Sequence, residues 1–266
     1  MGSNVWPVVE DLLVVGIVPD FIIRNEGSQD VPVYLDAAYG DEIASIESYE
    51  MNILAPNLEL FLSLGAEVLV APIEFQPFLP EDLMEPFDQI IFTQLDNWRA
   101  SVGRVVEGSG ADPSILDDLD ARYLARVAEV QGATSLDLPS LTISTFASNN
   151  GQVFPDSRQG PGMRAAIDVG LTPVAIAEDV PNREQPGVSL EEILQVDADL
   201  VFYNVRSQLT AEELAENALW QTGVAARNDT VYPGVSEWRQ GGFFGTLFVL
   251  DELEAALLDY EAKGLG

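Results

Sequence analysis

The chain has 266 residues, 47% of them hydrophobic, which is enough for one large or two modest globular domains. Its 12 Lys and Arg residues stand against 44 Asp and Glu residues, and the formal net charge of −32 disfavours nucleic acid and anionic lipid as partners. His and Cys are both absent, which excludes zinc sites with nitrogen or sulfur ligands, cysteine nucleophiles, disulfides and a Ser-His-Asp triad.

The first third of the chain predicts alternating helices and strands. We expect a helix over residues 6–15, with Pro7 in its first turn, and a strand over 21–24. Residues 30–52 are rich in acids and tyrosine, and we expect them to be mostly loop. Further strands are expected at 68–71 and 89–93, with a helical turn at 81–85 and a helix ending near Glu107. This alternation is typical of a parallel sheet.

A sixteen-residue phrase occurs twice. NLELFLSLGAEVLVAP begins at Asn57, and SLEEILQVDADLVFYN begins 132 positions later at Ser189. Each copy has a polar cap, apolar residues at helical spacing, a break and a continuous apolar run, so each predicts a helix, a tight turn and a buried parallel strand. The duplication indicates two similar lobes with a cleft between them, which is a common place for a ligand.

A long helix is predicted between the two copies, over residues 113–131. Apolar side chains recur there at spacings of three and four, from Ile115 to Val130. At 1.5 Å per residue the helix would extend ~28 Å, which is long enough to bridge two lobes as a stiff strut.

After Gly132 the alternation of strands and helices begins again. We expect strands at 141–146, 152–154, 200–203 and 231–232, with a turn at 149–151, and helices at 160–169, 210–217 and 245–260.

The chain resembles the helical-backbone (class III) substrate-binding proteins of ABC importers, in the branch that binds ferric siderophores. Four phrases carry the resemblance in the family's order and cover nearly the whole chain: NLELFLSLGAEVLVAP, DNWRASVGRVVEGSGADPSILDDLDARYLARV, VSLEEILQVDADLVFY and ALWQTGVAARNDTVYPGVSEWRQGGFFGTLFVLDELEAAL. The resemblance implies an α/β fold of two Rossmann-like lobes joined by a single long α-helix, with a ligand groove between the lobes and no catalysis.

The domains implied in this way are an N-terminal lobe over residues 1–111, a connecting helix over 112–132 and a C-terminal lobe over 133–266. Relatives usually start with a further strand, ahead of the segment that matches residues 6–15, and this sequence lacks it. The first lobe is therefore expected to be incomplete or differently edged.

The resemblance also implies a function. The protein would be a monomer that captures a ferric siderophore, with the iron held by the chelator and no cofactor of its own, and would deliver it to the permease subunits of an ABC importer. It would work outside the cytoplasm, in the periplasm or at the cell surface, lipid-anchored in a precursor whose leader has been removed; the amino-terminal letters MGSNVWP match neither a signal peptide nor a lipid-attachment segment.

Other functions stay open. A protein of the same fold could bind cobalamin or another cofactor, or could have lost transport and serve adhesion or signalling. A carboxylate-pair hydrolase is a further alternative, using acids from a dense set: Asp36, Asp41, Glu42, Glu47 and Glu50. Nothing in the sequence isolates a pair with the separation such an enzyme needs.

Two glutamates match the family's permease contacts. In family members the acid of the Leu-Glu step on each lobe faces outward and binds basic residues of the permease, which implies this role for Glu59 and Glu191. The alternative is an ordinary first-turn acid stabilised by the helix dipole.

Candidate ligand residues follow the predicted strand ends, where such lobes usually bind ligands. They are aromatic and arginine-rich, which suits a bulky organic chelate. On the first lobe they are Tyr49, Met51, Asn52, Phe75 and Trp98; on the second they are Phe146, Asn149, Phe154, Arg158, Tyr203, Arg206, Trp238, Arg239 and Phe243. Core packing is the alternative for Phe75, Phe154 and Tyr203, and it is favoured for Trp98.

Trp238 and Arg239 are the preferred pair, because the neighbouring Gly241 and Gly242 would let a ligand approach and an indole there would otherwise be exposed. The absence of His lowers the rank of bare metal ions and haem as ligands. The negative field would penalise a triply anionic catecholate complex, so a neutral or cationic hydroxamate complex is favoured.

Overall fold

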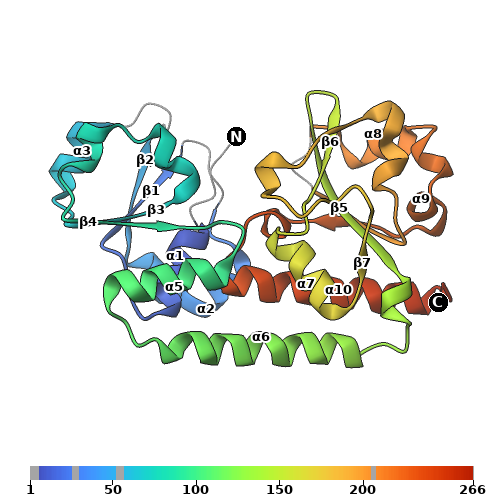
Figure 1. Ribbon diagram of the computed structural model, residues 1–266, viewed down its shortest axis with the longest axis horizontal. Helices are drawn as coiled ribbons and strands as arrows, with labels where there is room; N and C mark the ends of the chain where they lie inside the picture. The colour runs from blue at the N-terminus through green and yellow to red at the C-terminus, as the bar shows by residue number, and fades with distance from the viewer. Residues whose placement is uncertain (1–5, 26–29, 52–56, 205–207, 266) are drawn as a thin grey trace. The chain divides into compact units, whose positions relative to one another are not determined.

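The computed structural model describes residues 6–25, 30–51, 57–204 and 208–265 (Figure 1). The chain divides into two compact units, unit 1 (Met1–Asp120 and Gly241–Gly245) and unit 2 (Ala121–Gln240 and Thr246–Gly266). Each unit mixes helices with parallel strands, so the predicted α/β class is confirmed. The groove between lobes, the single connecting helix and the domain limits stay predictions.

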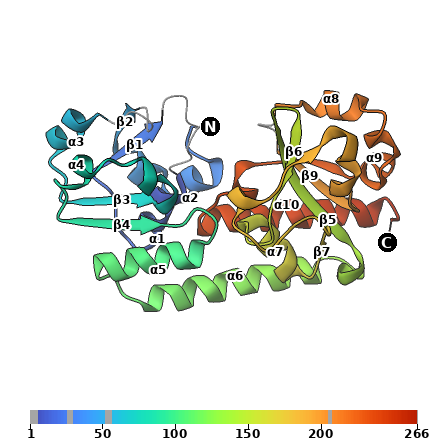
Figure 2. The ribbon, with the colours of Figure 1, turned by 45° about the horizontal axis from the view of Figure 1, so that its top comes forward.

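Parallel strand pairs form the centre of unit 1. β1 (Phe21–Asn25) pairs with β2 (Glu47–Met51), and β3 (Val68–Pro72) pairs with β4 (Gln89–Thr93). The helices of this unit are α1 (Trp6–Val14), α2 (Val33–Ala44), α3 (Leu58–Leu64), η1 (Ile73–Phe78), α4 (Glu81–Met84) and α5 (Trp98–Ser109). Figure 2 shows α5 lying along β3 and β4.

The expectation that residues 30–52 are mostly loop is wrong, because they contain α2 and β2. Leu35, Ile43 and Ile46 bury their side chains in a core with Trp6 and Ile22, and this packing outweighs the polar composition of the segment. β2 reads ESYEM, and its polar residues suit an edge strand that is held mainly by its backbone pairing with β1.

The two copies of the repeated phrase differ at the helix. In the first copy, the side chain of Asn57 accepts from Leu60 N at 3.2 Å, and α3 ends at Gly65 in the left-handed conformation, as predicted. The second copy forms a 3₁₀ helix, η4 (Leu190–Val196), instead of an α-helix. The Ser189 hydroxyl bonds to the Glu192 carboxylate at 3.0 Å, and Asp197 occupies the place of the glycine.

Unit 2 contains a mixed sheet in the order β10-β9-β5-β6-β8. β5 (Thr142–Asn149), β9 (Leu200–Asn204) and β10 (Val231–Gly234) are parallel, β6 (Gln152–Pro155) is antiparallel to β5, β8 (Val188–Ser189) is antiparallel to β6, and β7 (Thr172–Pro173) joins β5 in parallel. Asn150 and Gly151 both have positive φ, 50° and 73°, so the predicted turn between β5 and β6 is confirmed.

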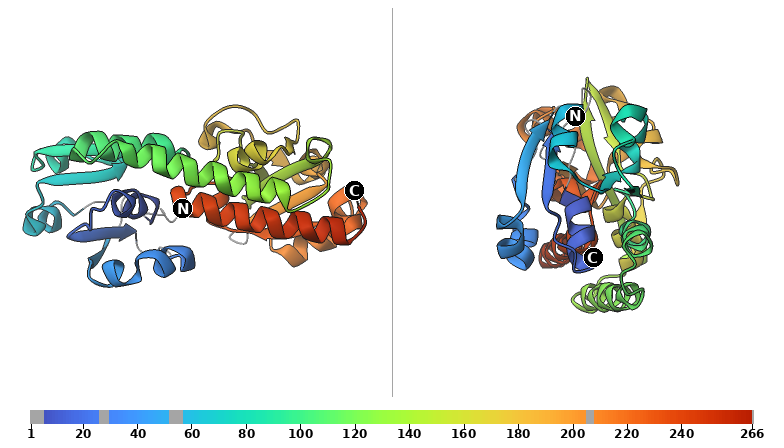
Figure 3. Two further views of the ribbon diagram at one scale, coloured as in Figure 1. Left: turned by 90° about the horizontal axis from the view of Figure 1, so that it is seen from below. Right: turned by 90° about the vertical axis from the view of Figure 1, so that its left-hand side faces the viewer.

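Helices α7 (Pro161–Val169), α8 (Ala211–Glu216) and α9 (Val224–Asn228) belong to unit 2 together with most of two long helices. α6 (Ser114–Gly132) is uninterrupted, as predicted, and α10 (Phe243–Ala262) lies beside it (Figure 3). Arg126 of α6 binds Asp251 at 2.7 Å and Glu254 at 2.5 Å on α10. In the described ranges of the chain, none of the helices combines the length and apolar character that a membrane span requires.

The first turn of α10 belongs to unit 1, and a buried carboxylate from α1 holds it there. Glu10 accepts hydrogen bonds from the backbone N–H groups of Phe244 and Gly245. A carboxylate at a helix amino terminus pairs with unsatisfied donors and with the positive end of the helix dipole. Gly242 is required beside it, because a Cβ there would lie 2.5 Å from the Glu10 carboxyl carbon.

We expect Glu10→Ala to destabilise the protein by about 1–2 kcal/mol, the upper part of the range for loss of a helix cap, because two buried N–H groups lose their acceptor. Glu10→Gln keeps one oxygen acceptor and should lose less. Urea unfolding followed by circular dichroism gives both values. Glu107→Ala is the matched control, since Glu107 is an exposed acid of unit 1, and equal losses for positions 10 and 107 would contradict the cap.

A partly buried acid lies in unit 2. The indole N–H of Trp238 donates to Glu252 at 2.7 Å, and the Trp238 ring stacks on Phe202 with centroids 4.2 Å apart. Desolvation raises the pKa of Glu252 from 4.5 to about 7; the Trp238 hydrogen bond opposes this rise, and the nearby charge of Glu237 adds to it. Glu252 is therefore protonated in part at neutral pH.

Because the folded-state pKa of Glu252 is raised, its contribution to stability is fully present below pH 4.5 and is lost as pH rises through about 7. Glu252→Gln should therefore gain stability over the wild type as pH increases from 5 to 8. After allowance for solvent screening, we expect a gain on the order of 1–2 kcal/mol at pH 8. Urea titrations at several pH values measure it, with the exposed Glu212→Gln as control; a difference independent of pH would contradict the shift.

Candidate functional site

In unit 1 the predicted ligand residues that the structure describes lie within a parallel strand or in the segments after two others. Tyr49 and Met51 belong to β2, Phe75 to the helix η1 after β3, and Trp98 begins α5 after β4. Two predicted residues, Asn52 and Arg206, lie outside the described residues.

Tyr49 and Phe75 are accessible. Both side chains are half-buried. The Tyr49 hydroxyl donates to Glu47 at 2.5 Å, and this hydrogen bond is the main cause that raises the pKa of Tyr49. The Tyr49 ring meets Phe21 edge to face at 6.2 Å. An aromatic surface with one polar tip can pack against an organic chelate.

Trp98 and Phe243 are packed against each other inside unit 1. Their ring centroids are 5.1 Å apart in an edge-to-face arrangement, and Trp98 is 4% exposed while Phe243 is fully buried. The core alternative for Trp98 is thus the one that the packing favours. Phe243, which was predicted with the residues of the second lobe, lies in unit 1 together with the first turn of α10 that Glu10 binds.

Three predicted residues are buried in unit 2. Phe146 packs against Trp220, and the Tyr203 hydroxyl donates to the carbonyl of Leu209. Trp238 is 1% exposed, so the expectation of an exposed indole is wrong: stacking on Phe202 and the bond to Glu252 satisfy it inside the unit. Packing accounts for these side chains, and contact with a ligand stays a prediction for each.

Four predicted residues of unit 2 remain accessible. Asn149 ends β5, Phe154 lies in β6, and both are half-buried. Arg158 is exposed, and its Nε donates to the carbonyl of Ala177 at 2.8 Å. Arg239 is partly buried. The Nε atoms of Arg158 and Arg239 are held by protein acceptors, so the remaining N–H groups of the two guanidinium groups can donate hydrogen bonds to ligand oxygens.

A buried acid that no sequence pattern indicated fixes the position of Arg239. Asp156 is buried directly after β6, accepts from the Thr145 hydroxyl and forms an ion pair with Arg239 Nε at 2.8 Å. Desolvation raises the pKa of Asp156, while Arg239 and the Thr145 hydrogen bond oppose the rise. The only signal in the sequence was the position of Asp156 at the end of a predicted strand. With 44 acids in the chain, that position did not distinguish Asp156 from the others.

Asn182 ties the same region together. Its Oδ1 accepts from Ser157 N at 2.8 Å, and its Nδ2 donates to the carbonyl of Arg239 at 3.1 Å. A Cβ on Gly162 would come within 2.4 Å of the Trp238 ring, so the start of α7 also packs closely on this region. The loops after β6 and β10 therefore form one hydrogen-bonded surface, which carries Arg158 and Arg239.

The two predicted permease contacts are both exposed. Glu59 lies in the first turn of α3, and Glu191 lies in the first turn of η4. A partner protein can therefore reach Glu59 on unit 1 and Glu191 on unit 2. Among the residues that the structure describes, no group of three or more acids is arranged to hold a metal ion.

Known proteins match this chain in structure, at low sequence identity. No family model and no curated protein matches it. Staphylococcus aureus SirA, by contrast, matches with a TM-score of 0.73 and 16% sequence identity, over 95% of this chain and 96% of SirA. Bacillus subtilis FeuA, a triscatecholate siderophore-binding protein in complex with ferri-bacillibactin, matches with a TM-score of 0.75 and 17% identity, over 95% of this chain and 89% of FeuA.

A third solved structure has the same fold. Vibrio cholerae FhuD, a siderophore-binding protein with Fe³⁺-Desferal bound, matches with a TM-score of 0.69 and 18% identity, over 95% of each chain. The likeness extends over nearly the full length of all three proteins. The chain therefore has the fold of the siderophore-binding proteins of iron uptake, as the resemblance in its sequence implied.

Proposed function

We propose that the protein captures a ferric siderophore outside the cytoplasm and delivers it to the permease of an ABC importer. The observation that carries the proposal is the full-length structural match to binding proteins for different siderophores: FeuA with ferri-bacillibactin, FhuD with Fe³⁺-Desferal, and SirA, which has also been seen with staphyloferrin B. These neighbours are binding proteins rather than enzymes, and we propose the same for this chain.

The accessible members of the predicted set are the proposed ligand contacts: Tyr49, Phe75, Asn149, Phe154, Arg158 and Arg239. Their rings supply apolar area, and their amide and guanidinium groups supply donors to chelate oxygens. The iron stays coordinated by the chelator. The ligand groove between lobes belongs to this proposal, as does a monomeric, lipid-anchored form of the protein.

A hydroxamate complex remains the favoured ligand, because of charge. The formal net charge of −32 disfavours a triply anionic catecholate complex, and Arg239, one of the two proposed guanidinium contacts of unit 2, is already paired with Asp156. The neutralised guanidinium attracts an anion less than a free one does. A neutral or cationic complex avoids this electrostatic cost.

Quenching of the four tryptophans tests the ligand class. We expect ferrioxamine to quench their fluorescence with 1:1 saturation and to bind more tightly than ferric enterobactin. Added salt should reduce the difference in affinity between the two complexes, since it screens the repulsion between the protein and the anionic complex. Iron-free ligands and cobalamin are the comparison samples. Tighter catecholate binding would reject the hydroxamate assignment, cobalamin binding alone would favour the cofactor alternative, and no binding of any of them would reject the function.

Variants in the same titration test the proposed contacts. Arg158→Gln should weaken ferrioxamine binding about tenfold, the loss expected for one charge-assisted hydrogen bond. Arg227→Gln is the matched control, because Arg227 is also exposed and its Nε also donates to a backbone carbonyl, that of Gly223, at 3.1 Å. An equal loss in both variants would point to a general charge effect.

The importer contact is proposed for Glu59 and Glu191. Both are exposed and lie in the first turn of a helix that follows a polar cap, one in each unit. Exposed acids in such places can pair with basic residues of a membrane partner and set the orientation of the complex.

We expect the Glu59→Lys, Glu191→Lys double variant to bind ferrioxamine like the wild type and to lose most uptake of ⁵⁵Fe-ferrioxamine, because reversed charges repel a basic surface. Uptake is measured in cells of the native host in which the variant replaces the wild-type gene. Glu81→Lys with Glu212→Lys is the control, since both are exposed first-turn acids, one in each unit. Wild-type uptake by the Glu59→Lys, Glu191→Lys variant would contradict the proposal that these two glutamates contact the importer.

A further inference from the structure

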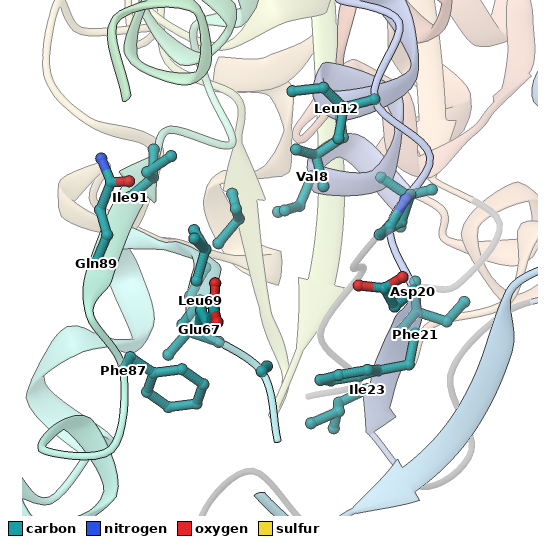
Figure 4. Close-up of a pocket in the computed structure, with 18 of the residues that line it drawn as sticks. Val8, Leu12, Asp20, Phe21, Ile23, Glu67, Leu69, Phe87, Gln89 and Ile91 are labelled. Atoms are coloured by element: carbon teal, nitrogen blue, oxygen red, sulfur yellow. The ribbon is translucent and has the colours of Figure 1, made fainter. Parts of the chain in front are cut away.

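Unit 1 contains a cavity of about 710 Å³ between its two pairs of strands (Figure 4). This volume lies within the ~300–1,000 Å³ of pockets that enclose most of a ligand. α1 supplies Val8 and Leu12 to its lining, β1 supplies Phe21 and Ile23, β3 supplies Leu69, and β4 supplies Ile91. The wall is therefore mainly apolar, and strand edges form two of its sides.

The cavity faces strand edges without a pairing partner. β1 pairs with β2 over its whole length, and residues of β1 line the cavity while those of β2 do not. β3 pairs with β4 over all five of its residues. Within the described ranges, no strand pairs with the second edge of β1 or of β3. Figure 4 shows the space between them, with the side chains of Val8 and Leu12 reaching toward it from α1.

The sequences of β1 and β3 are apolar. β1 begins Phe-Ile-Ile and β3 begins Val-Leu-Val-Ala, the continuous apolar runs typical of parallel strands whose two faces are both covered. The one charge in β1, Arg24, is bound to Ser48 and Glu50 of β2 and does not protect the free edge. Val68 is 46% exposed at the start of β3. Apolar strand edges without protection bind further strands readily.

Two acids line the cavity on opposite sides. Asp20 directly precedes β1, Glu67 directly precedes β3, and both are exposed and line the cavity. Figure 4 shows both carboxylates among the lining side chains. An occupant with a basic residue at its end could pair with them, while its apolar part fills the wall between the strands.

We propose that this cavity is a docking slot for an extended apolar peptide segment of about five residues with a basic residue at one end, which adds to unit 1 as a β-strand. Five residues match the lengths of β1 and β3. Backbone hydrogen bonds to the free strand edges give the affinity, and alternate side chains enter the apolar wall on either side of the strand.

The test uses a fluorescein-labelled heptapeptide, RVVIVLT, blocked at both ends, and fluorescence anisotropy with the full chain. We expect saturable 1:1 binding, and at least tenfold weaker binding of RVPIPLT, whose prolines remove two backbone donors at equal charge. EVVIVLT, with the basic end reversed to an acid, should also bind more weakly. Hydrogen exchange should slow at the amides of β1 and β3 on peptide addition, and stay unchanged in unit 2.

A slot variant and its control complete the test. Val68→Arg places a long cationic side chain in the lining of the slot and should weaken peptide binding at least tenfold. Val33→Arg alters a valine of α2 that is 74% exposed and does not line the cavity, so it should bind like the wild type. Unchanged circular dichroism and melting temperature show that both variants fold.

Three outcomes would overturn the proposal. Equal binding of the proline peptide would mean a non-specific apolar pocket. Protection of amides in the sheet of unit 2, with none in β1 or β3, would mean another strand edge. Concentration-dependent dimers in analytical ultracentrifugation that Val68→Arg abolishes and the peptide fails to disrupt would mean that a second copy of the chain occupies the slot.

Discussion

A shortage of cations governs how this fold can bury its acids. With 44 acidic and 12 basic side chains, most buried carboxylates must find neutral donors. Glu10 accepts from the backbone at the start of α10, Asp11 accepts from the Ser101 hydroxyl, and the partly buried Glu252 accepts from the Trp238 indole. The Asp197 carboxylate receives the first two N–H groups of α9, at 2.5 and 3.0 Å. Helix termini, hydroxyls and an indole therefore stabilise these carboxylates by hydrogen bonds, a role that lysine and arginine usually have in other proteins.

Buried acids whose hydrogen-bond donors are neutral have raised pKa values. Burial raises the pKa of Asp11 well above its usual value, and the Ser101 hydrogen bond only partly opposes the rise. Asp156 has a guanidinium partner as well as a hydroxyl, yet burial still raises its pKa. Hydrogen bonds from uncharged groups stabilise a carboxylate less than a close cation does, so these sites bind protons more readily in the folded state.

Periodicity and turn chemistry predicted most elements of the fold. The spacing of apolar residues in 113–131 is strong enough to identify α6, and Asn150-Gly151 identifies the turn between β5 and β6. α2 and β2 escaped prediction because their order comes from a few long-range contacts, such as those of Leu35 and Ile46 in the core with Trp6. The 3₁₀ form of η4 was not predicted because the two copies of the phrase share a hydrophobic spacing, which does not distinguish an α-helix from a 3₁₀ helix, while they differ at many other positions, among them Gly65 and Asp197.

The candidate site was less predictable than the fold. Residue type alone could not separate Trp238, whose indole is satisfied inside unit 2, from Arg158, which is exposed. Loop residues also share no periodic pattern, so the tie between Asn182 and Arg239, 57 positions apart, has no local signal. At 16–18% identity, the structural neighbours share an architecture with this chain while the loops that contact ligands are free to differ.

The bond between Glu10 and the start of α10 joins residues 234 positions apart. On the ribosome, α1 emerges long before the donors that its carboxylate needs. Until residue 245 has left the exit tunnel, Glu10 has neither of its helix-terminal partners, and Trp98 lacks the ring of Phe243. Unit 1 therefore cannot complete its core until unit 2 has also been translated. During this interval its apolar surface is exposed and can bind a holdase chaperone.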